Sequence, residues 1–106
     1  MKLYLIRKKN SISATGEYNP TTKQFTVLKG SRVSDFISSG KKFRGAVSIE
    51  KNRTNTVKDS LVVEDITFKS ASTAANFVTG TSTNGLITWK DENGRTLKEI
   101  TGDESK

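Results

Sequence analysis

The sequence predicts an α+β fold, in which an antiparallel sheet made of an N-terminal three-stranded meander and a C-terminal hairpin packs against one or two short helices. Residues 12–18 and 25–27 alternate apolar and polar side chains, which is typical of half-exposed strands. Residues 70–80 place apolar side chains at helical spacing and end in glycine. The turn sequences at residues 84–85 and 91–94 frame a last apolar stretch.

The chain has 106 residues, a length that allows one domain with one modest core. We expect this single α+β domain to span residues 1–101. Residues 102–106 are polar, and we expect them to form a frayed tail.

The first thirty residues predict the meander. Residues 3–6 are almost continuously apolar, which favours a strand that is buried on both faces or nearly so. The alternating residues 12–18 form the second strand, and Asn19-Pro20 ends it. Residues 25–27 form the third strand, and the short polar link before them makes it an antiparallel neighbour of the second.

The middle of the chain gives weaker signals. Residues 33–37 allow one helical turn, and the spacing of apolar residues over positions 46–60 predicts a helix despite poor helix formers at positions 54–56. Residues 61–68 predict either one strand or two half-strands around Glu64-Asp65.

The clearest helix of the chain is expected at residues 70–79. Ser70 or Ser72 can cap its start, and Gly80 can take the left-handed conformation that ends it. A helix this short needs packing against the sheet to be stable. Residues 86–90 are expected to follow as a strand with Ile87 and Trp89 on one face, and with Trp89 in the core opposite Leu97.

Cysteine and histidine are both absent. Their absence removes disulfides, thiolate nucleophiles, the commonest general base and the commonest metal ligands. The spacing from Gly80 to Gly85 matches a phosphate-binding loop, but Leu86-Ile87 stands where the Lys and Ser/Thr of that motif belong. We therefore expect a non-catalytic protein without a metal or cofactor. No apolar run is long enough for a signal peptide or a membrane span, so we expect a cytoplasmic location.

The positive charge is concentrated in the first half of the chain. Residues 1–58 hold thirteen Lys and Arg against three Asp and Glu, a net charge of +10, whereas residues 59–106 hold five against eight, a net charge of −3. This asymmetry favours a surface that binds a polyanion, although such residues also serve as solubilising loop charges. The candidate DNA-binding residues are Lys8, Lys9, Lys41, Lys42, Arg44, Lys51 and Arg53.

The second half of the chain carries a set of motifs: Phe68-Lys69-Ser70-Ala71-Ser72-Thr73-Ala74-Ala75, Gly80, Asn84-Gly85-Leu86-Ile87-Thr88-Trp89 and Gly94-Arg95-Thr96-Leu97. They resemble an uncharacterised bacterial domain-of-unknown-function family that occurs C-terminal to GIY-YIG nuclease modules and in restriction-modification contexts, and that is similar to the RAMA domain. The family pattern is F-x-S-P-S-x-A-A, a Gly, N-G-W-x-x-W and G-x-x-L. Residues 14–18 and 28–31 also match its first strands.

The chain departs from the family pattern at two positions, because Ala71 replaces the usual Pro and Leu86 replaces the first Trp. A stacking role of that Trp is therefore not carried over to this chain. The resemblance implies binding of DNA or other nucleic acid beside enzymatic modules. Together with the charge asymmetry, it predicts an accessory DNA-binding domain of a restriction or nuclease-type system. The alternative is a module that docks on a nuclease or methylase partner protein through exposed apolar residues such as Phe43 or Leu86.

Overall fold

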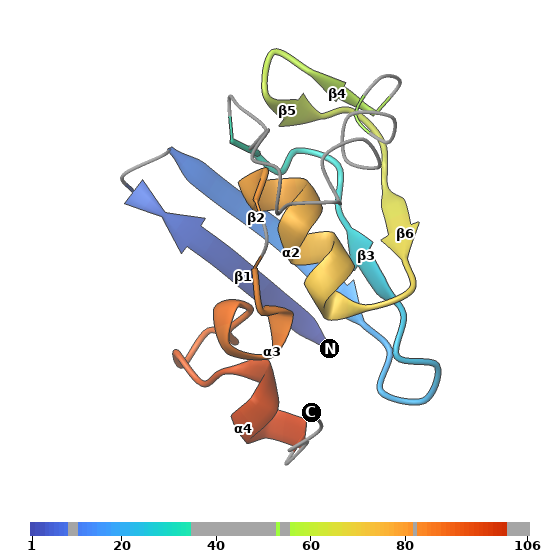
Figure 1. The fold of residues 1–106 in the computed structure, drawn as a ribbon, viewed down its shortest axis with the longest axis vertical. Coiled ribbons are helices and arrows are strands. Elements are labelled where there is room, and N and C mark those ends of the chain that lie inside the picture. Colours follow the sequence, from blue (N-terminus) through green and yellow to red (C-terminus); the bar gives the residue numbers. More distant parts are fainter. Residues whose placement is uncertain (9–10, 35–52, 54–55, 82, 102–106) are drawn as a thin grey trace.

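The computed structural model describes residues 1–8, 11–34, 53, 56–81 and 83–101. Four strands form one antiparallel sheet in the order β1-β2-β3-β6 (Figure 1). These strands are β1 (Lys2–Arg7), β2 (Ile12–Tyr18), β3 (Phe25–Val27) and β6 (Ile66–Phe68). The predicted α+β class and the N-terminal meander are confirmed.

A small hairpin of β4 (Val57–Lys58) and β5 (Leu61–Val62) stands at one end of this sheet. Its turn residues Asp59 and Ser60 both have positive φ, 53° and 67°, which suits a two-residue hairpin turn. The predicted helix over residues 46–60 is therefore wrong at its C-terminal end, and most of its other residues lie outside the described part of the chain. Of the two alternatives predicted for residues 61–68, one strand or two half-strands, the structure has the second, as β5 and β6.

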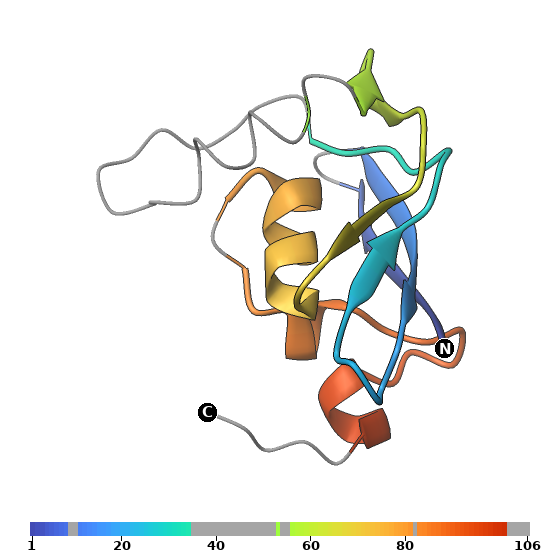
Figure 2. The same ribbon diagram turned by 90° about the vertical axis from the view of Figure 1, so that its right-hand side faces the viewer.

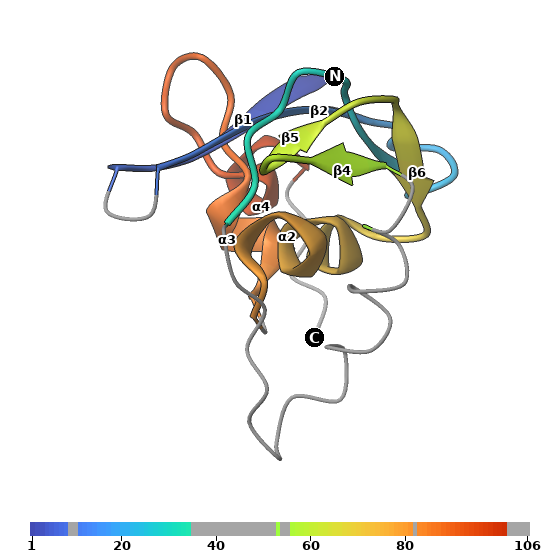
Figure 3. The same cartoon turned by 90° about the horizontal axis from the view of Figure 1, so that it is seen from above.

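Three helices follow the sheet: α2 (Ala71–Thr79), α3 (Gly85–Thr88) and α4 (Leu97–Thr101). Helix α2 packs against β2, β3 and β6. Figures 2 and 3 show that it covers one face of the sheet, while no described helix lies on the other face. The described part of the chain is thus a two-layer structure in which one face of the sheet is open.

Alternate strand residues point into the core between the sheet and α2. Leu3, Leu5, Phe25 and Val27 are all at most 1% exposed. The residues between them point to the open face, so Ile6 is 63% exposed and Tyr4 is partly exposed. The prediction that residues 3–6 are buried on both faces or nearly so is therefore wrong, because no described residue packs over Ile6 on the second face of β1.

Helix α2 begins and ends where the sequence predicts. The Ser70 Oγ accepts the backbone N–H of Thr73 at 3.1 Å, which caps the first turn. Gly80 has φ 77°, and its N–H donates to the Asn76 carbonyl at 2.8 Å. These caps satisfy backbone groups that a nine-residue helix would otherwise leave without partners.

The strand predicted at residues 86–90 is replaced by the short helix α3. The Asn84 side chain accepts the N–H of Leu86 at 3.0 Å, so Asn84 acts as a helix cap instead of a hairpin residue. As a result Ile87 is 53% exposed while Trp89 is fully buried, and the two do not share a face. The C-terminal hairpin is reduced to a bridge between Lys90 and Thr96, beside which the Leu97 N–H donates to the Trp89 carbonyl at 2.9 Å.

The starts of α2 and α3 are locked together around Trp89. The Trp89 Nε1–H donates to the Ala71 carbonyl at 3.0 Å, and the Gly85 N–H donates to the Ser72 Oγ at 3.0 Å. Gly85 packs so closely against Ala71 that an added Cβ would collide with its backbone. Only glycine fits at this contact.

Replacing Gly85 with alanine is therefore expected to lower the free energy of unfolding by about 1–3 kcal/mol, the usual cost of overpacking a tight site. Urea unfolding followed by far-UV circular dichroism measures this loss. The control is Ile87→Ala, which truncates an exposed side chain of the same helix. Equal stabilities for the two variants would contradict the proposed contact.

Candidate functional site

The open face of the sheet brings together elements that are far apart in the sequence. Residues paired across neighbouring strands point to the same face, so the register defines three rows on it. The first row is Ile6, Ser13, Arg32, Leu61 and Lys58; the second is Lys90, Tyr4 and Thr15; the third is Lys2, Glu17, Thr26 and Thr67. These residues are called the open face below.

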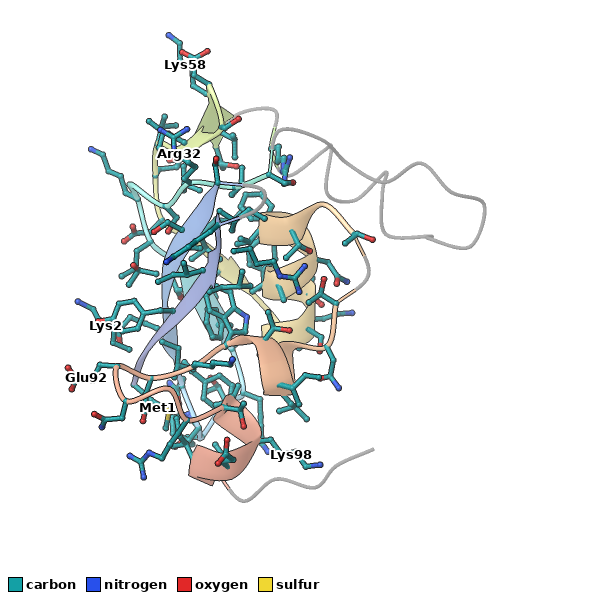
Figure 4. The ribbon with its side chains drawn as sticks, turned by 90° about the vertical axis from the view of Figure 1, so that its left-hand side faces the viewer. Met1, Lys2, Arg32, Lys58, Glu92 and Lys98 are labelled. Carbon is teal, nitrogen blue, oxygen red and sulfur yellow. The ribbon has the colours of Figure 1, made fainter. Side chains whose placement is uncertain are left out.

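Four cations lie in these rows, and Glu17 is their one carboxylate. Lys2 lies on β1 and Lys58 lies on β4. Arg32 belongs to the segment after β3, and Lys90 to the segment after α3. Figure 4 shows Lys2 and Arg32 on the side of the strands away from α2, whereas Lys98 projects from α4 on the other side. The meander and the bridges thus gather separate charges on one surface.

These four cations make no ion pair with any other described residue. The ion pairs within the described ranges are those of Met1 with Glu17 at 3.5 Å and of Arg95 with Asp91 at 3.1 Å. The N-terminal ammonium therefore partly offsets the carboxylate of Glu17. The charges of the four cations stay available to an external anion.

Hydroxyl groups lie in the same three rows as the cations. Ser13 and Thr67 are exposed, while Thr15 and Thr26 are partly exposed. The Thr26 and Thr67 hydroxyls bond to each other at 2.8 Å. Hydroxyl donors beside Lys and Arg are the groups that proteins use to hold phosphate oxygens.

The structure describes two of the predicted site residues, Lys8 and Arg53. Lys8 is exposed directly after β1, and its carbonyl accepts the Ser11 N–H at 3.2 Å. The other predicted residues lie outside the described part of the chain: Lys9, Lys41, Lys42, Arg44 and Lys51.

Arg53 holds the end of α2. Its Nη2 donates to the Phe77 carbonyl at 2.6 Å, and its Nη1 donates to the Ser34 carbonyl at 3.1 Å. Its guanidinium carbon lies 5.7 Å from the centre of the Phe77 ring. A cation at a helix C-terminus stabilises the exposed carbonyls there, so these contacts give Arg53 a structural role.

Arg53→Ala is expected to lower the free energy of unfolding by about 1–3 kcal/mol, because carbonyls at the end of α2 lose a charged donor. Arg53→Lys should recover only part of this loss, since an ammonium cannot reproduce the planar fork. Urea unfolding measures both variants, with the exposed Arg95→Ala as control. A stable Arg53→Ala variant that has lost affinity for DNA would instead place Arg53 in an interface.

Four motif residues of the second half stabilise the fold. Ser70 and Gly80 cap α2, Gly85 contacts Ala71, and Trp89 is buried. None of the four lies in a row of the open face. These motif residues therefore identify the fold. The residues of the open face follow from the pairing of the strands and not from the motif.

Two carboxylates next to this motif have a lowered pKa. The backbone N–H of Arg95, followed by that of Asn93 and the Arg95 guanidinium, holds the pKa of Asp91 below its ordinary value. The backbone N–H and hydroxyl of Thr96 do the same to the pKa of Glu99. Asp91 thus stabilises a turn and Glu99 the start of α4. Among the described residues, no group of three potential metal ligands lies close together.

Sequence reasoning did not single out Lys2, Tyr4, Arg32, Lys58 and Lys90 as one surface. The available signal was the alternation of Tyr4 and Ile6 with the core residues Leu3 and Leu5. The bridges that place Arg32 and Lys90 beside these strands are long-range contacts without a local sequence pattern.

None of the helices in the described part of the chain has the length and hydropathy that crossing a bilayer requires. Comparison with curated proteins and with solved structures finds no match. A family model described as "Domain of unknown function (DUF4357)" matches residues 4–101. Because this match covers nearly the whole chain, the protein belongs to the DUF4357 family of domains of unknown function.

Proposed function

We propose that this domain binds DNA without catalysing a reaction, and that the open face is its contact surface. The observation that carries the proposal is the set of four cations, Lys2, Arg32, Lys58 and Lys90, which share this face without an ion pair to any described residue. Such cations bind a polyanion by releasing its condensed counterions.

The spacing of these cations suits a phosphate backbone. Neighbouring strands lie about 4.8 Å apart, and residues two apart on a strand lie about 7 Å apart. Arg32 and Lys90 are separated by three strand spacings and one such step, so their Cα atoms lie roughly 16 Å apart. Because duplex DNA carries one charge for about every 1.7 Å of its axis, this span covers several phosphates.

The proposed context is an accessory role in a restriction or nuclease-type system, as the resemblance to domains beside GIY-YIG modules implies. In that role the domain would add affinity for DNA, while an attached or associated enzyme performs the chemistry. The excess of positive charge in residues 1–58 supports the same proposal.

The test is fluorescence anisotropy of labelled duplex and single-stranded DNA, each titrated with the protein at several salt concentrations. If the protein contacts four phosphates, the logarithm of the association constant should fall with the logarithm of the salt concentration with a slope of about −3 to −4. Affinity should therefore fall roughly a hundredfold between about 50 and 200 mM salt. No measurable binding of either form of DNA at low salt would rule the proposal out.

The second candidate function is docking on a partner nuclease or methylase. It is favoured by Ile6 and Leu61, which are 63% and 37% exposed and lie in the same row as Arg32. Leu86 is instead partly buried against the core. Charge reversal at Lys2 and Lys90, which lie outside the row of Ile6 and Leu61, discriminates between the two functions. It should weaken DNA binding strongly under the first function and leave partner pull-down intact under the second.

A further inference from the structure

We propose that the DNA held by the open face is unpaired, and that one of its bases stacks on the ring of Tyr4. The inference rests on the proposed function and specifies its ligand. It follows from the position of Tyr4, from a hollow beside it and from the cations on either side.

Tyr4 is the one described aromatic residue on the open face. The other described aromatic residues are at most 6% exposed and belong to the core: Tyr18, Phe25, Phe68, Phe77 and Trp89. The N–H and carbonyl of Tyr4 pair with those of Lys90 at 2.7 and 2.9 Å, which fixes β1 at this point. The partly exposed Tyr4 side chain is thus held on the solvent side of the sheet by the backbone on which it sits.

A hollow of about 420 Å³ adjoins Tyr4, and residues of β1 and of the turn at 91–95 line it: Lys2, Tyr4, Asp91, Glu92, Asn93 and Arg95. The Asp91 carboxylate already has hydrogen-bond partners within the turn, because it accepts the N–H groups of Asn93 and Arg95 at 2.9 Å each. Glu92 and Asn93 are exposed, and no other described residue holds their side chains. Figure 4 shows Glu92 and Lys2 on the same side of the molecule.

The charges of this region fix how a strand would lie. Lys90 flanks Tyr4 across the strands, and Lys2 lies two residues away along β1. Phosphates would sit against these two lysines and away from the carboxylate of Glu92. The base would then turn toward the hollow, where Glu92 and Asn93 offer an acceptor and an amide to its edge.

Stacking on Tyr4 requires an unpaired strand. In a duplex the bases are stacked on one another and present only their edges. A tyrosine ring on the surface of a sheet therefore cannot reach their faces. In a single strand the bases can splay out and stack on aromatic side chains between cations. The open face offers this combination of an aromatic ring and flanking positive charges.

The test compares a labelled oligothymidine of about 12 nucleotides, a length within the usual site sizes, with a duplex of the same length. Wild-type protein should bind the single strand more tightly. Tyr4→Ala should weaken single-strand binding about five- to hundredfold and leave the salt slope unchanged, because stacking carries no charge. Tyr4→Phe should restore most of the lost affinity, and Ile87→Ala, an exposed truncation on α3, should change nothing.

Proton NMR gives a readout that a merely structural role of Tyr4 would not move. The ring protons of Tyr4 should shift upfield when the oligothymidine is added, and those of the buried Tyr18 should not. If the duplex binds as tightly as the single strand, or if Tyr4→Ala binds like wild type, this inference fails while the proposed function stands. If neither form of DNA binds, both fail.

Discussion

Replacing Trp89 with alanine is expected to remove a large part of the stability of this domain. The side chain is fully buried, and its ring centre lies 4.2 Å from that of Phe25. Truncating a buried Trp costs about 3–5 kcal/mol, and the Ala71 carbonyl would also lose its indole donor. Since small domains have about 5–15 kcal/mol of stability in total, this loss should lower the urea midpoint of the variant strongly.

Urea unfolding followed by far-UV circular dichroism measures this loss without relying on tryptophan fluorescence. Trp89→Phe retains most of the packing but loses the hydrogen bond, so it should fall between wild type and Trp89→Ala. The matched control is Ile87→Ala, two residues away and 53% exposed, with an expected change within about 0.5 kcal/mol. A loss below about 1 kcal/mol for Trp89→Ala would refute the central place of this residue in the core.

Reversing two charges of the open face should have the largest effect on DNA binding. Arg32→Glu and Lys90→Glu lie on either side of β1 and β2 and alter side chains only, since the strands bridge through backbone groups. The double variant should bind DNA at least about tenfold more weakly at low salt. Its log–log salt slope should be smaller than that of wild type by about 2, one for each lost phosphate contact.

Lys98→Glu is the matched control for each single reversal. Lys98 is exposed on α4, on a different side of the molecule from Lys2 (Figure 4). The change in net charge is identical, so general repulsion of DNA affects all three single variants equally. If Lys98→Glu weakens binding as much as Arg32→Glu or Lys90→Glu, the effect comes from net charge, and the open face is not the interface.

The parts of the fold that the sequence predicts well are those with local causes. The alternation in β2 and the caps of α2 at Ser70 and Gly80 are set by neighbouring residues, and the structure confirms them. The two half-strands near Glu64-Asp65 follow from an equally local break.

The errors arise where a distant contact overrides a local pattern. Asn84-Gly85 has the sequence of a hairpin turn. However, Gly85 packs closely against Ala71 and Ser72 of α2, and Asn84 caps a helix instead. The apolar run at residues 3–6 predicts a fully buried strand because the sequence does not reveal that the described elements leave one face of β1 uncovered.

The candidate site depends on long-range contacts in the same way. Arg32 joins the open face through bridges to Ser13 and Leu61, and Lys90 joins it through a bridge to Tyr4. The sequence supplied the excess of positive charge but not the pairing that places these residues together. For Arg53, the sequence predicts a DNA contact from its place in the basic half of the chain. In the structure, its guanidinium donates to the carbonyls at the end of α2.

Mapping the amide signals of the protein by NMR during a DNA titration tests the proposed interface most directly. If the open face binds DNA, the largest shifts should fall on β1, on alternate residues of β2, and on Arg32 and Lys90, and they should disappear as salt is added. Shifts concentrated on α2 and α4, or no shifts at low salt, would contradict the proposal that this uncovered face of the sheet binds DNA.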